Sequence, residues 1–179
     1  MIAQQDVAEN QRRGRVLVLS GPSSSGKSTV AREFQQSEDT PWLTLDADVV
    51  LAAYPFDKAP ELATTARRLN LGLFASAAAF ARAGVDVICE QVFWNQATYD
   101  DARACLDGLP ACFVEVTVEL DVAEKREARR DERMAGTSRE QRSQLWTEVK
   151  YDYQLDTTTG TPADAATELA AWVTQALPR

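Results

Sequence analysis

The octapeptide from Gly21 to Ser28, GPSSSGKS, constrains the fold more than any other part of this sequence. It follows Arg15–Ser20, where an unbroken run of leucine and valine is typical of a parallel strand buried on both faces. It leads into Lys27–Gln36, a stretch that we interpret as a helix. Glycines let such a loop curl with its amide N–H groups pointing inward, beside the positive end of the helix. The sequence therefore predicts a strand, an anion-binding loop and a helix in direct succession.

The spacing of this loop, G-x-x-x-x-G-K-S, is that of the phosphate-binding loop (P-loop) of enzymes that use nucleoside triphosphates. Lys27 should bridge the β- and γ-phosphates, and the Ser28 hydroxyl should ligate Mg²⁺. The alternative is a Ser-rich surface turn with a solvated lysine, and the flanking strand and helix argue against it. We therefore expect ATP and Mg²⁺ as cofactors. The residues expected to bind them are Gly21, Pro22, Ser23, Ser24, Ser25, Gly26, Lys27, Ser28 and Thr29.

The rest of the chain alternates short apolar runs with longer helix-like stretches, which is typical of an α/β protein with a parallel sheet. We predict a three-layer P-loop NTPase fold: a five-stranded parallel sheet with helices on both faces, and a small arginine-rich lid. The predicted strands are Arg15–Ser20, Trp42–Leu45, Val85–Cys89, Cys112–Val118 and Tyr153–Asp156. The predicted helices are Lys27–Gln36, Pro60–Ala83, Gln96–Asp107, Asp121 to about Arg133, Ser138–Lys150 and Pro162–Ala176.

At 179 residues the chain suits a single domain, which we place at 15–179 after a flexible tail of residues 1–14. It has 27 acidic and 19 basic residues, and this net charge of −8 argues against broad nucleic-acid binding. It has no histidine, which excludes the usual zinc sites and histidine-based acid–base catalysis. No secretion signal and no bilayer-length apolar stretch occurs, so we expect a cytoplasmic protein without a membrane partner.

Acidic residues follow two of the predicted strands. Asp46 and Asp48 stand at the end of the second strand, where a period of two puts both on one face. Such a carboxylate would accept the proton of an attacking hydroxyl, unless one of them only caps the next helix. Glu90 ends the third strand, where an acid would hold a magnesium-bound water or hydrogen-bond the substrate. A structural cap is again the alternative.

Four arginines, Arg126, Arg129, Arg130 and Arg133, are spaced to share one helical face shortly before Gly136. A flexible glycine beside a basic helix indicates a lid, at about 126–142, that closes over the triphosphate and excludes water. The alternative is a solvated helix whose neighbouring acidic residues pair with the arginines.

Aromatic residues cluster after two strand ends, Tyr54 with Phe56 and Phe93 with Trp94. They would line an apolar pocket for the acceptor, or else belong to the core. Together with the acids, the expected substrate-binding residues are Asp46, Tyr54, Glu90, Phe93 and Trp94.

The motifs of other P-loop classes are missing from the sequence. The GTPase motifs Asn-Lys-x-Asp and Asp-x-x-Gly do not occur, and the chain is too short for an AAA-type ATPase module. A kinase needs an acid near the second strand and mobile arginines, and both are present. We therefore predict an enzyme that transfers the γ-phosphoryl group of ATP to a hydroxyl of a small molecule.

From about Val16 to its last helix, the sequence resembles the chloramphenicol 3-O-phosphotransferase family of P-loop kinases. The resemblance implies that Gly21–Ser28 bind ATP and that Asp48, rather than Asp46, is the catalytic base. It also implies that Arg130 and Arg133 belong to the lid and act in catalysis together with Lys27. By the same likeness we expect a homo-oligomer. The segments that carry the likeness are GPSSSGKS, Pro41-Trp42-Leu43 with Asp48, Val92-Phe93, residues 127–141, and Tyr151-Asp152 before Asp156-Thr157-Thr158.

Three features depart from the family pattern. Glu90-Gln91 takes a place where the family has paired aspartates, Asp46 adds an acid, and the segment Tyr54–Glu61 is shorter. The acceptor is therefore open: chloramphenicol, or a related hydroxylated antibiotic or metabolite. The alternatives are a kinase of the shikimate, gluconate or nucleoside monophosphate type, and a non-catalytic nucleotide-binding regulator. A nucleotide acceptor would need phosphate-binding arginines, for which Arg67 and Arg68 are the candidates.

Overall fold

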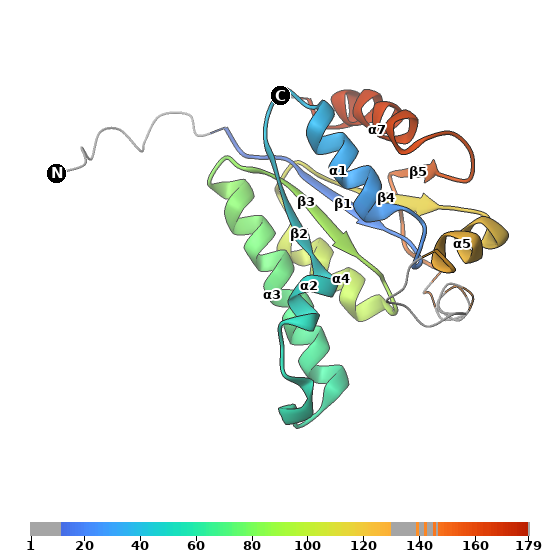
Figure 1. Ribbon diagram of the computed structural model, residues 1–179. Helices are drawn as coiled ribbons and strands as arrows, with labels where there is room; N and C mark the ends of the chain where they lie inside the picture. The colour runs from blue at the N-terminus through green and yellow to red at the C-terminus, as the bar shows by residue number, and fades with distance from the viewer. Residues whose placement is uncertain (1–11, 130–138, 140–141, 143–144, 146, 179) are drawn as a thin grey trace.

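The computed structural model describes residues 12–129, 139, 142, 145 and 147–178, and it places a five-stranded sheet at the centre (Figure 1). The strands lie in the order β2-β3-β1-β4-β5, and every neighbouring pair is parallel. The strands are β1 (Val16–Ser20), β2 (Trp42–Asp46), β3 (Asp86–Gln91), β4 (Ala111–Thr117) and β5 (Tyr153–Asp156).

Two pairs of helices cover the two faces of this sheet. The helices α1 and α7 pack together over one face, and α3 and α4 pack together over the other (Figure 1). The predicted three-layer α/β fold is therefore confirmed. The described helices are α1 (Lys27–Ser37), α2 (Ala47–Ala52), α3 (Leu62–Arg82), α4 (Gln96–Cys105), α5 (Leu120–Glu127), α7 (Pro162–Ala176) and a 3₁₀ turn at Phe56–Lys58. Among the described residues, no helix has the length and hydrophobicity needed to span a membrane.

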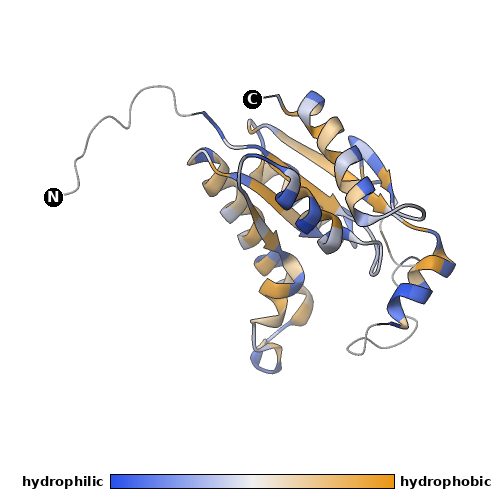
Figure 2. Cartoon of the chain, turned by 45° about the horizontal axis from the view of Figure 1, so that its top comes forward, coloured by the Kyte–Doolittle hydropathy of each residue, from blue (hydrophilic) through white to orange (hydrophobic). Residues whose placement is uncertain are grey.

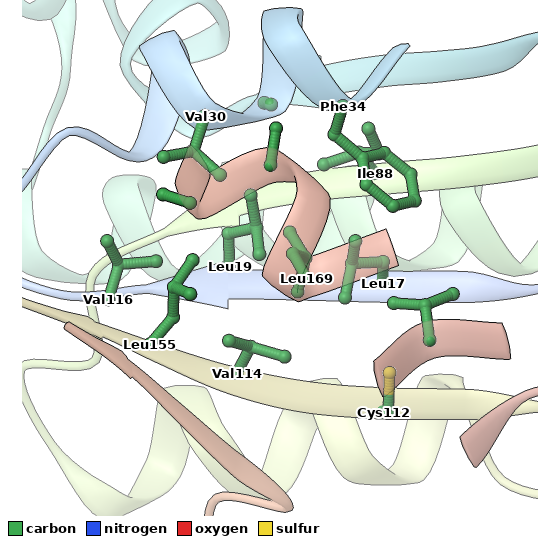
Figure 3. Packing of buried hydrophobic residues seen from close by; sticks show 14 of the residues in the cluster. Leu17, Leu19, Val30, Phe34, Ile88, Cys112, Val114, Val116, Leu155 and Leu169 are labelled. Atoms are coloured by element: carbon green, nitrogen blue, oxygen red, sulfur yellow. The ribbon is translucent and has the colours of Figure 1, made fainter. Parts of the chain in front are cut away.

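The central strand β1 divides its side chains between the two faces. Leu17 and Leu19 pack against α1 and α7 (Figure 3), whereas Val16 and Val18 pack on the side of α3 and α4. All four side chains are fully buried. A strand buried on both faces has no polar face to show, so its sequence reads as one hydrophobic run. Figure 2 shows the same hydrophobic colour along the strands of the sheet.

The structure adds one helix to the predicted set and corrects two of the predicted helices. A short helix, α2, follows β2 directly and was not predicted. The helix expected from Asp121 to about Arg133 ends at Glu127 and is followed by a turn. The helix expected over Ser138–Lys150 does not reach its predicted end, because residues 147–150 are turn or irregular. Most of its remaining residues lie outside those described.

A buried ion pair joins β1 and β3 at the edge of the sheet where these strands begin. The Arg15 guanidinium donates to Asp86 Oδ2 at 2.6 Å, and the Arg15 amide donates to Asp86 Oδ1 at 2.8 Å. Both residues are almost fully buried, and the guanidinium also lies 4.4 Å from the ring centre of Trp42 in β2. Because each charge depends on the other inside the protein, the pair fixes how three strands meet at this edge.

Residues 12–14, which the sequence placed in the tail, lie against the sheet and helices. The Gly14 amide donates to the Ala81 carbonyl at 2.7 Å, and Arg12 pairs with Asp86 at 3.6 Å. A Cβ on Gly14 would lie 2.0 Å from the Val85 carbonyl oxygen. The chain therefore enters β1 in a position that only glycine accepts. Residues 1–11 of the predicted tail lie outside the described residues.

Replacing Asp86 with alanine is expected to lower the free energy of unfolding by about 3–5 kcal/mol, because it leaves the buried Arg15 charge without its partner. Urea unfolding followed by circular dichroism measures this. The exposed Asp107 provides the matched control, and Asp107→Ala should change stability by less than about 0.5 kcal/mol. Equal losses in the two variants would contradict the structural role of the pair.

Candidate active site

The P-loop runs from the end of β1 to the start of α1 and is shaped by its two glycines. A Cβ on Gly21 would lie 2.2 Å from the Val116 carbonyl oxygen of β4, so the loop passes the neighbouring strand too closely for any side chain. Gly26, immediately before α1, has a φ of 98°, which L-residues rarely adopt. Together the glycines bring the loop back over the first turn of α1, as an anion-binding loop requires.

The inside of this loop holds buried polar groups, and two of their hydroxyls make no hydrogen bond among the described residues. Ser23, Ser24 and Ser25 are all buried, and the hydroxyl oxygens of Ser24 and Ser25 have no hydrogen-bond partner among the described residues. The Lys27 ammonium curls over the loop and donates to the carbonyls of Gly21 at 2.8 Å and Pro22 at 3.1 Å. Buried hydroxyls without partners and a nearby ammonium fit the oxygens of a bound triphosphate.

Ser28 and Glu90 join α1 to β3 beside the P-loop. The Ser28 hydroxyl donates to Glu90 Oε2 at 2.6 Å, and Glu90 is 4% exposed. Burial raises the pKa of Glu90, the hydrogen bond from Ser28 lowers it, and the nearby charge of Asp46 raises it further. This hydrogen bond links the end of β3 to the first turn of the P-loop helix.

The oxygen atoms of Ser28 and Glu90 fit a Mg²⁺ ion, which prefers hard oxygen ligands and keeps several waters. Among the described residues, no group of three or more acidic, cysteine or histidine side chains comes close enough to form a metal site. An ion held here would therefore complete its coordination with phosphate oxygens and water, as is usual where Mg²⁺ binds with a nucleotide.

Asp46 and Asp48 lie together at the mouth of the P-loop, although not by the predicted geometry. The period-of-two prediction was wrong, because β2 ends at Asp46 and Asp48 lies in the first turn of α2. Asp46 caps α2: its Oδ1 accepts from the Asp48 amide at 2.7 Å. Both residues nevertheless line one cavity with Lys27, Ser28 and Glu90.

The far end of this cavity is formed by α2, α3 and the residues at the end of β3. Trp94, which the sequence analysis assigned to an acceptor pocket, lines this cavity, and its side chain is 38% exposed. Sequence reasoning missed Leu51, Ala66, Asn70 and Gln91, which line the same end. Asn70 carried a usable signal, because it is a polar residue in an otherwise apolar stretch of helix.

Two predicted substrate-binding residues do not reach the cavity. Phe93 is 1% exposed and packs against Phe74, Tyr99 and Phe113 in the core, so its assignment to the acceptor wall was wrong. Tyr54 is half-exposed beside Phe56 and is absent from the cavity lining. Of the two adjacent aromatic residues after β3, Phe93 is therefore buried in the core and Trp94 lines the cavity.

A second cavity lies on the other side of the P-loop, between α1, the end of α5 and the start of α7. Thr29, Arg126, Arg129 and Thr157 are among the residues that line it. Arg126 donates to the Thr157 hydroxyl at 3.0 Å, and this hydroxyl donates in turn to the Ser25 carbonyl at 2.6 Å. The P-loop, β5 and α5 thus meet at a single threonine.

The predicted lid falls largely outside the described residues, and Arg130 and Arg133 are among those not described. The described arginines of this region serve other contacts. Arg126 binds Thr157, Arg139 pairs with Glu124 at 2.9 Å, and Arg142 donates to the Val118 carbonyl.

Comparison with known proteins identifies the family to which this chain belongs. The profile of the family described as "Chloramphenicol phosphotransferase-like protein" matches residues 14–174, nearly the whole chain. The chain belongs to this family. It is therefore a phosphotransferase of the P-loop kinase type, and the family resemblance seen in the sequence is confirmed.

Individual relatives are more distant. A Mycobacterium tuberculosis protein named as a proposed O-phosphotransferase is 25% identical over 181 residues, with 87% of this chain and 80% of the relative aligned. Among solved structures, a sugar kinase from Janibacter aligns with a TM-score of 0.70 at 20% identity, covering 89% of this chain and 94% of its own. The APS kinase of M. tuberculosis aligns at 0.71 and 19% identity, covering 90% and 98%. These structural likenesses establish the shared fold.

Replacing Gly21 with alanine is expected to weaken binding of a fluorescent ATP analogue at least tenfold. The added methyl group must displace either the P-loop or the β4 backbone, and either shift moves the amides that hold the phosphates. Gly72 in α3 is the matched control, since no atom lies within 4 Å of a Cβ there. Gly72→Ala should keep nucleotide affinity and raise stability by about 0.5–1 kcal/mol. Unchanged affinity in Gly21→Ala would contradict the assigned loop geometry.

Proposed function

We propose that this protein transfers the γ-phosphoryl group of ATP to a hydroxyl of a small molecule, an antibiotic such as chloramphenicol or a related metabolite. One observation carries the proposal. Asp48 lines the same cavity as Lys27 and Ser28, and residues outside the P-loop, among them Leu51, Ala66, Asn70 and Trp94, line it as well and form what we take as its acceptor end. A base, a phosphate site and a space for a second molecule therefore share one enclosure, as direct transfer between two bound substrates requires.

In the proposed reaction, the acceptor hydroxyl oxygen bonds to the γ-phosphorus as the bond between this phosphorus and the bridging oxygen breaks. The hydroxyl proton passes to the Asp48 carboxylate, and ADP leaves with the electron pair of the broken bond. Lys27 and the P-loop amides hold the phosphate oxygens in line. Mg²⁺ would supply positive charge at the phosphates from its place at Ser28. Arg130 and Arg133 are proposed to close over the transferring group.

Two further acids have supporting roles in this proposal. Asp46 positions the base, because its carboxylate accepts from the Asp48 amide and so fixes the first turn of α2. Glu90 orients the Ser28 hydroxyl through their 2.6 Å hydrogen bond, so that the serine oxygen stays at the place where the metal would bind. Neither residue needs to touch the reacting atoms for the transfer to depend on it.

A nucleotide acceptor receives less support from the contacts. Arg67, the candidate to bind an acceptor phosphate, instead donates twice to Asp101 of α4, at 2.7 and 3.0 Å. Neither Arg67 nor Arg68 lines the cavity. This contact holds α3 to α4 on the outside of the protein, and it gives Arg67 a structural role.

Replacing Asp48 with asparagine should lower kcat at least a hundredfold, because the variant keeps the shape of the base but cannot accept the proton. ADP release at saturating Mg²⁺ and ATP, measured with a panel of hydroxylated acceptors, tests this. ATP affinity should not change. The exposed Asp57→Asn variant is the control and should behave like the wild type. If no acceptor stimulates ADP release and the Asp48 variant matches the wild type, the protein is a nucleotide-binding regulator and the proposal fails.

Replacing Ser28 with alanine should raise the Mg²⁺ concentration needed for half-maximal activity at least tenfold. Ser28→Thr keeps the hydroxyl and should raise this concentration far less. Titration of Mg²⁺ at fixed ATP measures the effect. Equal Mg²⁺ dependence in the alanine and threonine variants would contradict the role assigned to this hydroxyl.

A further inference from the structure

One residue that lines the acceptor end of the cavity carries a buried hydrogen-bond donor that has no partner among the described residues. Gln91, the last residue of β3, is 4% exposed and lines the cavity. Its Oε1 accepts from the Val92 amide at 2.7 Å. Since a backbone N–H can only donate, this bond fixes which end of the carboxamide is oxygen. The remaining group, Nε2, is buried and has no hydrogen-bond partner among the described residues.

A buried N–H without a partner loses the hydrogen bond that it would make with water, so a native protein rarely keeps one without a use for it. The position of Gln91 shows where the use lies. Residues of β3 alternate between the two faces of the sheet: Ile88 packs with α1 and α7, and Cys89 packs with α3 and α4. Glu90 therefore faces the P-loop helix, where it meets Ser28, and Gln91 faces α3.

A second carboxamide approaches from that helix. Asn70 of α3 is 9% exposed and lines the same cavity. Gln91 and Asn70 thus place two uncharged hydrogen-bonding groups at the acceptor end, beside the apolar side chain of Leu51 and the exposed edge of Trp94. A pocket of this kind selects a ligand by the positions of its oxygens rather than by its charge.

The charges of the described cavity lining disfavour an anionic acceptor. Its described lining contains three acids, Asp46, Asp48 and Glu90, and among these described lining residues Lys27 is the only base. Lys27 lies over the P-loop carbonyls, at the phosphate end. A carboxylate or phosphate on the acceptor would therefore meet like charges, with no cation beyond Lys27 among the described lining residues to bind it, which costs affinity.

We propose that Gln91 is the residue that selects the acceptor, and that the acceptor is an uncharged molecule with an oxygen atom that accepts a hydrogen bond close to the hydroxyl that reacts. Gln91 Nε2 donates to this second oxygen, which is a carbonyl, ether or hydroxyl oxygen. The inference rests on the proposed function, since it concerns the acceptor end of the same site.

Binding, measured separately from turnover, tests the inference. Calorimetry of the protein loaded with Mg²⁺ and ADP would compare neutral acceptors with anionic partners on the same scaffold: a nucleoside against its monophosphate, and a methyl glucoside against the methyl glucuronide, with chloramphenicol as a further neutral probe. At least one neutral probe should bind, and at least tenfold more tightly than its anionic counterpart where it has one. Tighter binding of the anionic members, or no binding by any neutral probe, would overturn the inference.

The decisive variant is Gln91→Glu, which keeps an oxygen for the Val92 amide and replaces the unpartnered N–H by a second oxygen. It should weaken the best neutral probe at least tenfold while ATP affinity stays the same. Gln96→Glu, the same change at an exposed position on α4, is the matched control and should have no effect. Wild-type affinity in Gln91→Glu would overturn the assignment.

Two further results separate this inference from the proposed function. If Gln91→Glu does not fold, Asn70→Leu tests the same acceptor end, because leucine is well accepted in a helix such as α3. This variant should also lower the affinity for the neutral probe severalfold. If neutral probes bind through Gln91 but none stimulates ADP release, the selection inference stands and the proposed phosphoryl transfer fails.

Discussion

The parallel register of β1 and β3 is the constraint on which the rest of the site depends. Ser20, the last residue before the P-loop, is paired with Gln91, and Leu19 is paired with Glu90. This register places Glu90 on the face of the sheet that α1 covers. The next residue, Gln91, lies on the face that α3 covers. A slip of one residue would exchange the two faces. The buried pair of Arg15 and Asp86 resists such a slip at the opposite end of the same two strands.

The site is thus assembled from strand ends, and each layer of the fold contributes one function. The layer of α1 and α7 carries the phosphate loop and the second cavity at Thr157. The layer of α3 contributes Ala66 and Asn70 to the main cavity, and α2 contributes Asp48, the proposed base. Because the sheet separates these layers, Glu90 and Gln91, which we propose to serve the metal and the acceptor, stay apart although they are neighbours in the sequence. The two substrates meet only beyond the carboxyl ends of the strands, as is general for open parallel sheets.

Sequence patterns were sufficient for the sheet and the P-loop, because both depend on local and strongly patterned residues. They were insufficient where a single residue decides between two environments. Phe93 and Trp94 are adjacent aromatics after β3, and only the packing of Phe74 and Tyr99 around Phe93 shows which of them is core. The six residues of α2 are too few for a helical period, so Asp48 was assigned to a strand face. Arg67 looked available for a phosphate until its partner, Asp101 on a separate helix, was known.

The arm formed by α2, the 3₁₀ turn and the first half of α3 extends beyond the sheet (Figure 1) and has a consequence for how the enzyme changes over time. It supplies Asp48, Leu51, Ala66 and Asn70 to the cavity, and none of its residues belongs to the core cluster under α1 and α7. Ala47 of the arm packs with Val16 and Val18 of β1 in the other core cluster, but mutations farther out in the arm would leave the packing under α1 and α7 intact. Modularity of this kind lets a lineage try new acceptors while it keeps the same phosphate donor.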